Sequence, residues 1–168
     1  MKRSTILFRL LCLLCLLPYV AQAIPNPWLD LTQEELAARA GIVVQLPEDA
    51  EPAVYRLLPE MALAEVQFTW QGWKCVFRAA PGDELTDVTG LYYTWETQED
   101  CTVGDSVGCV WTAEDVSVCL WYDGLRSCSF ALLGPEAATA DVRSAAEFIA
   151  APLQEPDEGE PATENGTP

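Results

Sequence analysis

The chain has 168 residues, of which 26 are acidic, nine are basic and none is histidine, and its formal charge at pH 7 is −17. Such a charge repels phosphate backbones and anionic lipid surfaces, which argues against nucleic acids and membrane surfaces as partners. The absence of histidine excludes Ser-His-Asp and Cys-His catalytic sites and histidine-ligated metals, and no motif indicates a cofactor.

Residues 1–23 have the pattern of a cleaved signal peptide. A basic amino end precedes a leucine-rich run and a small-residue cleavage motif that ends at Ala23. The apolar run, from Leu10 to Ala21, is shorter than the roughly 20 apolar residues that span a bilayer. We therefore expect cleavage after Ala23, secretion or placement on the extracellular face of the cell envelope, and no stable membrane insertion afterwards. The remaining chain has six basic and 26 acidic residues, a charge of −20.

Residues 24–151 are expected to form a single domain that begins with a short helix. Thr32 and Glu35 have the spacing of a capping box, and Gly41 is a typical helix stop. The pattern therefore predicts a helix from Gln33 to Ala40.

A twofold periodicity follows, and it predicts a strand over residues 54–58 and then a hairpin. The hairpin strands, at 63–70 and 73–78, are joined by the two-residue turn Gln71-Gly72. Counting outward from this turn pairs three sets of residues on one face: Trp70 with Trp73, Phe68 with Cys75, and Val66 with Phe77. On the other face it pairs Thr69 with Lys74 and Glu65 with Arg78, the latter being a pair of opposite charge.

The rest of the chain indicates further strands and a final helix. Residues 88–96 alternate like a strand, whereas 97–108 resemble a loop with at most a short strand. Three more strands are expected at 109–112, 116–122 and 125–132, and a helix at 139–150 that is capped by Thr139 or Asp141. The acidic residues 152–168 are expected to be a disordered tail.

These elements predict an α+β fold class. We expect an antiparallel sheet of about six or seven strands, with an N-terminal and a C-terminal helix packed on one face.

Five cysteines follow the predicted signal peptide, and export favours their use in disulfides: Cys75, Cys101, Cys109, Cys119 and Cys128. A two-residue turn at Asp123-Gly124 would place Cys119 opposite Cys128, at disulfide distance. A three-residue loop at 113–115 would instead place Cys119 opposite Cys109. The first pairing is preferred because Asp-Gly specifies a turn more strongly.

If Cys119 and Cys128 pair, Cys101 could close on Cys109 across seven residues, and Cys75 would remain as a buried free thiol opposite Phe68. The connectivity stays open at this point.

Carboxylates are the one residue type abundant enough to suggest catalysis. Glu96, Glu99, Asp100 and Asp105 lie near the end of a predicted strand, so a carboxylate-dependent hydrolase with an extracellular substrate is the alternative function. The same loop, or Asp83, Glu84 and Asp87, offers carboxylates for weak Ca²⁺ binding, but no EF-hand spacing organises these acids, and no metal site is predicted.

Aromatic residues on both faces of predicted strands suggest binding instead. Tyr92 points away from Tyr93, and Tyr122 points away from Trp121, so one face of each strand must be covered or exposed. We expect Tyr92, Trp121 and Tyr122 to contribute to an exposed aromatic patch that binds a protein or a saccharide.

Four segments carry a resemblance to a known group of proteins: "IPNPWLDLTQEEL", "VYRLLPEMALAEVQF", "GLYYTWE" and "CLWYD". Over most of residues 25–150 the chain resembles small exported proteins of unassigned function from Gram-positive bacteria. The resemblance implies a bacterial exported domain and no catalytic residues. The preferred hypothesis is therefore a secreted, non-enzymatic binding or interaction module.

Overall fold

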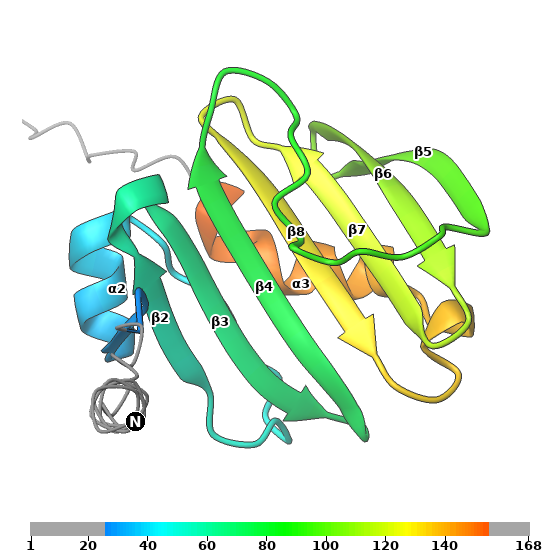
Figure 1. Cartoon of the computed structure of the whole chain (residues 1–168), viewed down its shortest axis with the longest axis horizontal. Helices are drawn as coiled ribbons and strands as arrows, with labels where there is room; N and C mark the ends of the chain where they lie inside the picture. Colours follow the sequence, from blue (N-terminus) through cyan, green and yellow to red (C-terminus); the bar gives the residue numbers. More distant parts are fainter. Residues whose placement is uncertain (1–25, 155–168) are drawn as a thin grey trace, which may run out of the picture.

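Eight strands form one antiparallel sheet in the computed structural model, which describes residues 26–154 (Figure 1). The predicted signal peptide lies outside these residues, as does the predicted tail from residue 155 onward. In chain order the elements are β1 Leu29–Leu31, α2 Gln33–Ala40, β2 Val54–Leu58, a 3-10 turn Pro59–Met61, β3 Leu63–Trp70, β4 Trp73–Pro81, β5 Thr97–Val103, β6 Ser106–Ala113, β7 Val116–Tyr122, β8 Arg126–Leu133, a 3-10 turn Ala137–Thr139, and α3 Val142–Gln154.

The sheet consists of two four-stranded meanders that meet at β4 and β8. The strand order is β1-β2-β3-β4-β8-β7-β6-β5, so the chain must travel from β4 to the far edge of the sheet before β5 begins. Residues 82–96 make this connection, and we call them the crossover segment. They pass over one face of the sheet while α3 lies behind the other (Figure 1). We call these the outer face and the inner face.

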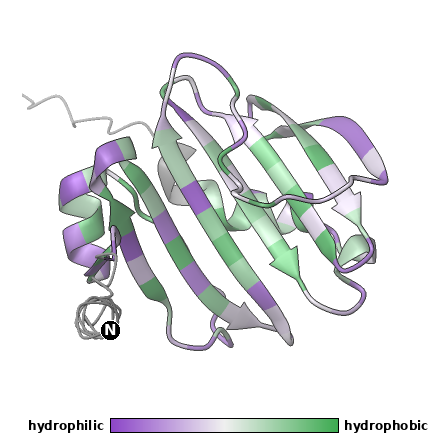
Figure 2. Ribbon diagram, in the orientation of Figure 1, coloured by the Kyte–Doolittle hydropathy of each residue, from purple (hydrophilic) through white to green (hydrophobic). Residues whose placement is uncertain are grey.

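The main hydrophobic core lies between the inner face and the helices. Leu36 of α2 and Ile149 of α3 belong to the same cluster as Phe77 of β4 and Phe130 of β8. Strands β7 and β8 are buried along almost their whole length, because α3 covers one side of them and the crossover segment the other. Apolar residues predominate in both strands (Figure 2). The fold is thus broadly α+β, with eight strands rather than six or seven.

The predicted elements are confirmed where a helix cap or a tight turn defines them. Helix α2 runs from Gln33 to Ala40, with the Thr32 capping box formed and Gly41 in the left-handed conformation at its end. The β3–β4 register is the predicted one, including Trp70 opposite Trp73 and Glu65 opposite Arg78.

The prediction for residues 88–96 was wrong, because they form no strand and belong to the crossover segment. Leu91 and Trp95 pack against the outer face, whereas Tyr92 points to solvent. An extended chain lying on an apolar surface alternates in polarity just as a strand does, even without a hydrogen-bonded ladder. The missing strand is found instead at Thr97–Val103, a polar segment that forms the edge strand β5.

The last helix starts and ends later than predicted. Helix α3 covers Val142–Gln154, and Ala137–Thr139 forms a separate 3-10 turn before it. Of the two predicted caps, Asp141 takes the role, because its carboxylate accepts a hydrogen bond from the Ser144 backbone N–H at 3.1 Å.

Candidate functional site

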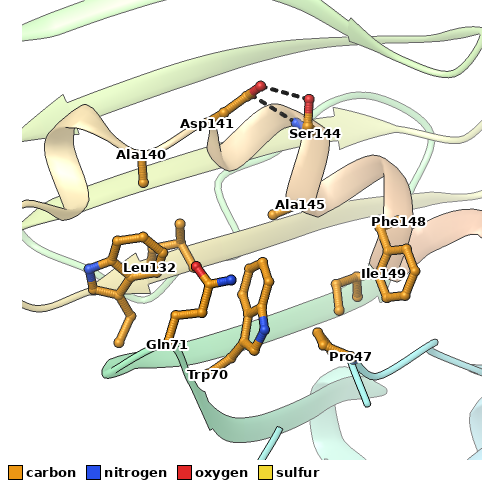
Figure 3. Close-up of a pocket in the computed structure, with 11 residues that line it drawn as sticks. Pro47, Trp70, Gln71, Leu132, Ala140, Asp141, Ser144, Ala145, Phe148 and Ile149 are labelled. Atoms are coloured by element: carbon orange, nitrogen blue, oxygen red, sulfur yellow. Dashed lines mark hydrogen bonds between the residues drawn. The ribbon is translucent and has the colours of Figure 1, made fainter. Parts of the chain in front are cut away.

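An apolar groove with a volume of about 440 Å³ runs between helix α3 and the β3–β4 hairpin (Figure 3). Its volume lies within the range of about 300–1,000 Å³ that is usual for binding pockets. We call it the α3 groove, and its lining residues are Pro47, Trp70, Gln71, Trp73, Leu132, Ala140, Asp141, Ser144, Ala145, Phe148 and Ile149.

A tight turn brings two tryptophans to one end of the groove. Gln71 and Gly72 have φ values of 52° and 86°, and two positive values are what a type I′ hairpin turn requires. The turn places Trp70 opposite Trp73, with ring centroids 6.4 Å apart and an edge-to-face angle of 70°. The sequence thus forms this wall of the groove by a purely local device.

Both indole N–H groups in the groove already have partners within the protein. The Trp70 indole donates to Oδ1 of Asp49 at 2.8 Å, and the Trp73 indole donates to the backbone oxygen of Pro135 at 3.0 Å. These bonds fix the rings, and the surfaces that remain for a ligand are apolar ones.

The other wall is the first half of α3. Oδ1 of Asp141 accepts the backbone N–H of Ser144, and Oδ2 accepts the Ser144 hydroxyl at 2.7 Å. Hydrogen bonds from the Ser144 hydroxyl, and then from its backbone, hold the pKa of Asp141 below its usual value, so this carboxylate stays charged at the rim of the groove.

The floor is apolar, and one ring stands at its margin. The side chains of Leu132 and Ile149 are buried beneath the groove, and Ala145 is half-buried above them. Phe148 lies one turn further along α3 and leaves 42% of its surface exposed. A large aromatic side chain exposed beside an apolar depression is typical of a binding surface.

The charge around the groove is negative. Asp141 lines it, and Glu48 and Asp49 directly follow Pro47, another lining residue. Of the six basic residues beyond residue 23, four are held in ion pairs with acids, which leaves a large acidic excess uncompensated: Arg56, Arg78, Arg126 and Arg143. The groove therefore favours a neutral or cationic occupant.

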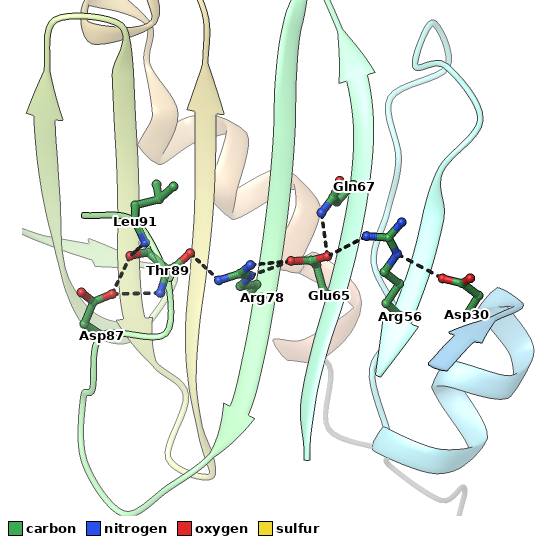
Figure 4. Close-up of polar contacts among 8 residues, drawn as sticks. All are labelled: Asp30, Arg56, Glu65, Gln67, Arg78, Asp87, Thr89 and Leu91. Carbon is green, nitrogen blue, oxygen red and sulfur yellow. Dashed lines mark hydrogen bonds and ion pairs between the residues drawn. The ribbon is translucent and has the colours of Figure 1, made fainter. Parts of the chain in front are cut away.

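The outer face contains a buried ion pair that connects the crossover segment to the sheet (Figure 4). Glu65, whose side chain is 2% exposed, accepts from Nη2 of Arg78 at 2.7 Å and from Nε at 2.8 Å. Nη1 of Arg78 donates to the backbone oxygen of Thr89 at 2.6 Å. Since each of the three nitrogens of the Arg78 head has a partner inside the protein, this cluster is structural.

The three aromatics that were predicted to form an exposed patch do not lie together on the surface. Tyr92 is 98% exposed on the crossover segment, but Trp121 is 1% exposed and packs beside Phe77 in the inner core. Tyr122 is half-buried, and its hydroxyl donates to the backbone oxygen of Gly82. The error arises because the inner face, which carries Trp121, is covered by α3.

Both predicted cysteine pairings were wrong, and all five cysteines of the described chain are free thiols. In the β7–β8 register, Cys119 lies opposite Phe130 and Cys128 opposite Trp121. The Asp123 carboxylate causes this shift of two residues, because it accepts the backbone N–H groups of Leu125 and Arg126 and so widens the loop.

The alternative pairing fails for a different reason. Glu114 and Asp115 form a two-residue turn, so Val110 rather than Cys109 lies opposite Cys119. A shift of one residue turns a side chain to the other face, and Cys109 accordingly packs in the outer cluster. Cys101, the predicted partner of Cys109 if Cys119 and Cys128 pair, belongs with Cys119 to the inner cluster.

The carboxylates considered for hydrolysis do not converge. Glu99 and Asp100 are neighbours on β5 and point to opposite faces, and Asp105 lies in the turn after that strand. Glu96 and Asp105 lie beyond opposite ends of β5, whose seven residues span roughly 23 Å. Across residues 26–154 no three acidic or cysteine side chains are grouped closely enough to hold a metal ion, and this includes Asp83, Glu84 and Asp87.

Sequence reasoning missed the α3 groove because its two walls come from distant parts of the chain. The sequence predicted that Trp70 and Trp73 face each other on one side of a hairpin, and only tertiary packing places that side next to α3. One signal was available: Phe148 is a large apolar residue outside the helical spacing of Val142, Ala146 and Ile149, so it had to point away from the core.

No helix in the part of the chain that the structure describes has both the length and the apolar character to cross a membrane. Comparison of the chain with protein-family models, with curated proteins and with solved structures gave no match.

Proposed function

We propose that this protein is an exported, non-enzymatic binding module of a bacterial cell surface or its surroundings, and that the α3 groove is its binding site. The observation that carries the proposal is an apolar groove of about 440 Å³, with an exposed Phe148 at its margin, on a strongly acidic protein. The signal-peptide pattern of residues 1–23 and the resemblance to exported bacterial proteins support the location.

The occupant that fits this groove is a polypeptide segment with an aromatic or aliphatic anchor and basic neighbours. The anchor would occupy the space between Trp70 and Ala145, and lysine or arginine residues beside it would face the carboxylates of Asp141 and Glu48. Apolar anchors in pockets supply most of the affinity in such interfaces, and the charge complementarity raises the association rate.

The dimensions of the groove agree with a short extended segment. Its wall on α3 extends from Ser144 to Ile149, which corresponds to about 8 Å along the helix axis. About three residues of an extended chain cover the same distance.

A saccharide is a weaker candidate because its hydroxyl groups need several free hydrogen-bond partners. The indole N–H groups of Trp70 and Trp73 and both oxygens of Asp141 are engaged within the protein. Among the polar side chains that line the groove, the Gln71 amide is the one that makes no hydrogen bond to another described residue. One amide is too little to orient a sugar ring.

The hydrolase alternative receives no support from the site geometry. General acid and base carboxylates must lie within about 10 Å of each other across a substrate, and the candidate acids are spread along β5 instead.

The test is selection of binders from a random dodecapeptide display library on the immobilised protein, followed by titration of the enriched peptides as synthetic molecules. We expect enriched peptides to contain an aromatic or aliphatic residue flanked by lysine or arginine, and their affinity to fall as salt concentration rises. Enrichment of acidic peptides, or of sequences without an apolar anchor, would contradict the proposal.

A pair of matched variants locates the site. Ala145→Trp fills the groove from the middle of its helical wall, and we expect at least a tenfold loss of peptide affinity. Ala38→Trp makes the same change at an exposed position of α2 that does not line the groove. This variant should bind the peptide with the same affinity as the unmodified protein. Equal affinities for both variants would place the binding site elsewhere.

A further inference from the structure

Two thiols of the inner face approach each other although neither was predicted to pair with the other. The Sγ atoms of Cys101 on β5 and Cys119 on β7 are 3.9 Å apart. The two strands are not neighbours, because β6 lies between them. Cys119 is fully buried, whereas Cys101 is half-buried at the edge of the sheet.

Gly108 is the reason that these side chains can meet across the intervening strand. It lies on β6 opposite Cys101, and its other neighbour in the sheet is Trp121 of β7. With no side chain at this position, β6 leaves a gap on the inner face beside Cys101, and the next inward-facing residue of β6, Val110, lies opposite Cys119. A Cβ atom at Gly108 would also overlap the carbonyl oxygen of Leu120, so the strands are close here.

We infer that Cys101 and Cys119 are a disulfide-forming pair, oxidised when the protein meets a disulfide oxidant such as oxidised glutathione or a thiol oxidoreductase. The inference does not rest on the proposed function of the α3 groove. It requires an oxidant, which an exported protein encounters outside the cytoplasm.

The reaction proceeds by two exchange steps. The Cys101 thiolate, being the more accessible, attacks one sulfur of the oxidant disulfide and releases the first thiol. The Cys119 thiolate then attacks Sγ of Cys101 in the mixed disulfide and releases the second thiol. The two cysteines together lose two electrons and two protons. The two thiols released from the oxidant gain these electrons and protons.

The sulfurs must approach by about 2 Å to reach the bonded distance of about 2.05 Å. Because β6 lies between the two strands, closure requires β5, an edge strand that pairs with β6 alone, to curl toward the inner face through changes of backbone as well as side-chain angles. Burial raises the pKa of Cys101 and of Cys119, so both thiols are mainly protonated at neutral pH and exchange accelerates under alkaline conditions.

The test is peptide mapping of the full chain after equilibration at pH 8.5 with a mixture of reduced and oxidised glutathione. Free thiols are alkylated in denaturant, and the digest is compared by mass spectrometry with and without reduction. We expect a disulfide-linked peptide pair that contains Cys101 and Cys119, with Cys75, Cys109 and Cys128 alkylated. Linkage of Cys119 to any other cysteine, or a glutathione adduct on Cys101 without ring closure, would overturn the inference.

Stability provides an independent measurement. The bond would close a loop of 18 residues, and its reduction is expected to lower Tm by roughly 10 °C. Cys101→Ser and Cys119→Ser should each abolish this difference between oxidised and reduced protein, whereas Cys109→Ser, which removes a thiol of the outer cluster, should keep it. The pairing would also be refuted if Cys109→Ser lost the Tm difference between oxidised and reduced protein, or if Cys101→Ser kept it.

Discussion

Replacing Arg78 by methionine should be among the most damaging single substitutions on the outer face. The guanidinium group makes two charge-assisted hydrogen bonds to Glu65, at 2.7 and 2.8 Å, and one to the backbone oxygen of Thr89. It also stacks over the ring of Trp28 at 5.9 Å. Methionine keeps much of the aliphatic volume and removes all of these contacts.

The expected loss follows from what remains around Glu65. Its side chain is buried, and after the change its partners are the Gln67 amide at 2.6 Å and Nη1 of Arg56 at 3.8 Å. Breaking one side of a buried ion pair destabilises proteins by about 3–5 kcal/mol, so we expect about 4 kcal/mol for Arg78→Met. With a denaturant dependence of about 2 kcal/mol per molar, the urea midpoint should fall by about 2 M.

Equilibrium unfolding in urea, followed by tryptophan fluorescence, measures this loss against two controls. Arg56→Met removes the more exposed arginine next to Glu65 and should cost only about 1 kcal/mol. The double variant Glu65→Leu with Arg78→Met replaces the pair by apolar side chains and should recover most of the stability. Two results would refute this reasoning about the pair. One is a free energy of unfolding for Arg78→Met within 1 kcal/mol of that of the unmodified protein, and the other is a double variant that is as unstable as Arg78→Met.

Three further substitutions test other parts of the fold. Gly108→Ala should lower the free energy of unfolding by about 2 kcal/mol, because the new methyl group overlaps the Leu120 carbonyl oxygen. Thr32→Ala removes the α2 capping box and should cost about 1 kcal/mol, measured by urea unfolding, with Thr32→Ser as the control that retains the cap. Asp141→Ala should cost about 1 kcal/mol at pH 7, and the loss should shrink below about pH 4. The reason is that a carboxyl with a lowered pKa in the folded state stabilises the protein above its unfolded pKa, and this contribution disappears as pH falls through the folded pKa. A loss that is the same at pH 7 and pH 2.5 would contradict it.

The hairpins show where prediction from the sequence succeeds and where it stops. The β3–β4 register follows from Gln71 and Gly72, two residues whose backbone angles define the turn without outside help. The β7–β8 turn contains the stronger Asp-Gly signal, yet its register differs by two residues. There the Asp123 side chain accepts backbone hydrogen bonds and also binds the Arg126 guanidinium at 2.9 Å, which stabilises a wider loop.

The size of a register error decides how much of the prediction survives it. A shift of two residues leaves every side chain on its predicted face, so Cys119 and Cys128 are both in the inner core although they do not pair. The shift of one residue between β6 and β7 places Cys109 on the outer face and removes it from Cys119 altogether. The face of the sheet to which a side chain points is therefore easier to predict from the sequence than its partner on the neighbouring strand.

The sequence by itself determined the elements whose physical causes are local. These are the capped helix α2, the β3–β4 hairpin and the alternation of its faces, together with the negative charge and the lack of histidine that limit the possible functions. Only the tertiary structure decided that β4 pairs with β8, that residues 82–96 cross the outer face, and that Trp70 lies beside Ala145. The α3 groove and the approach of Cys101 to Cys119 depend on those contacts. They unite segments separated by tens of residues, and no local backbone preference encodes such a meeting.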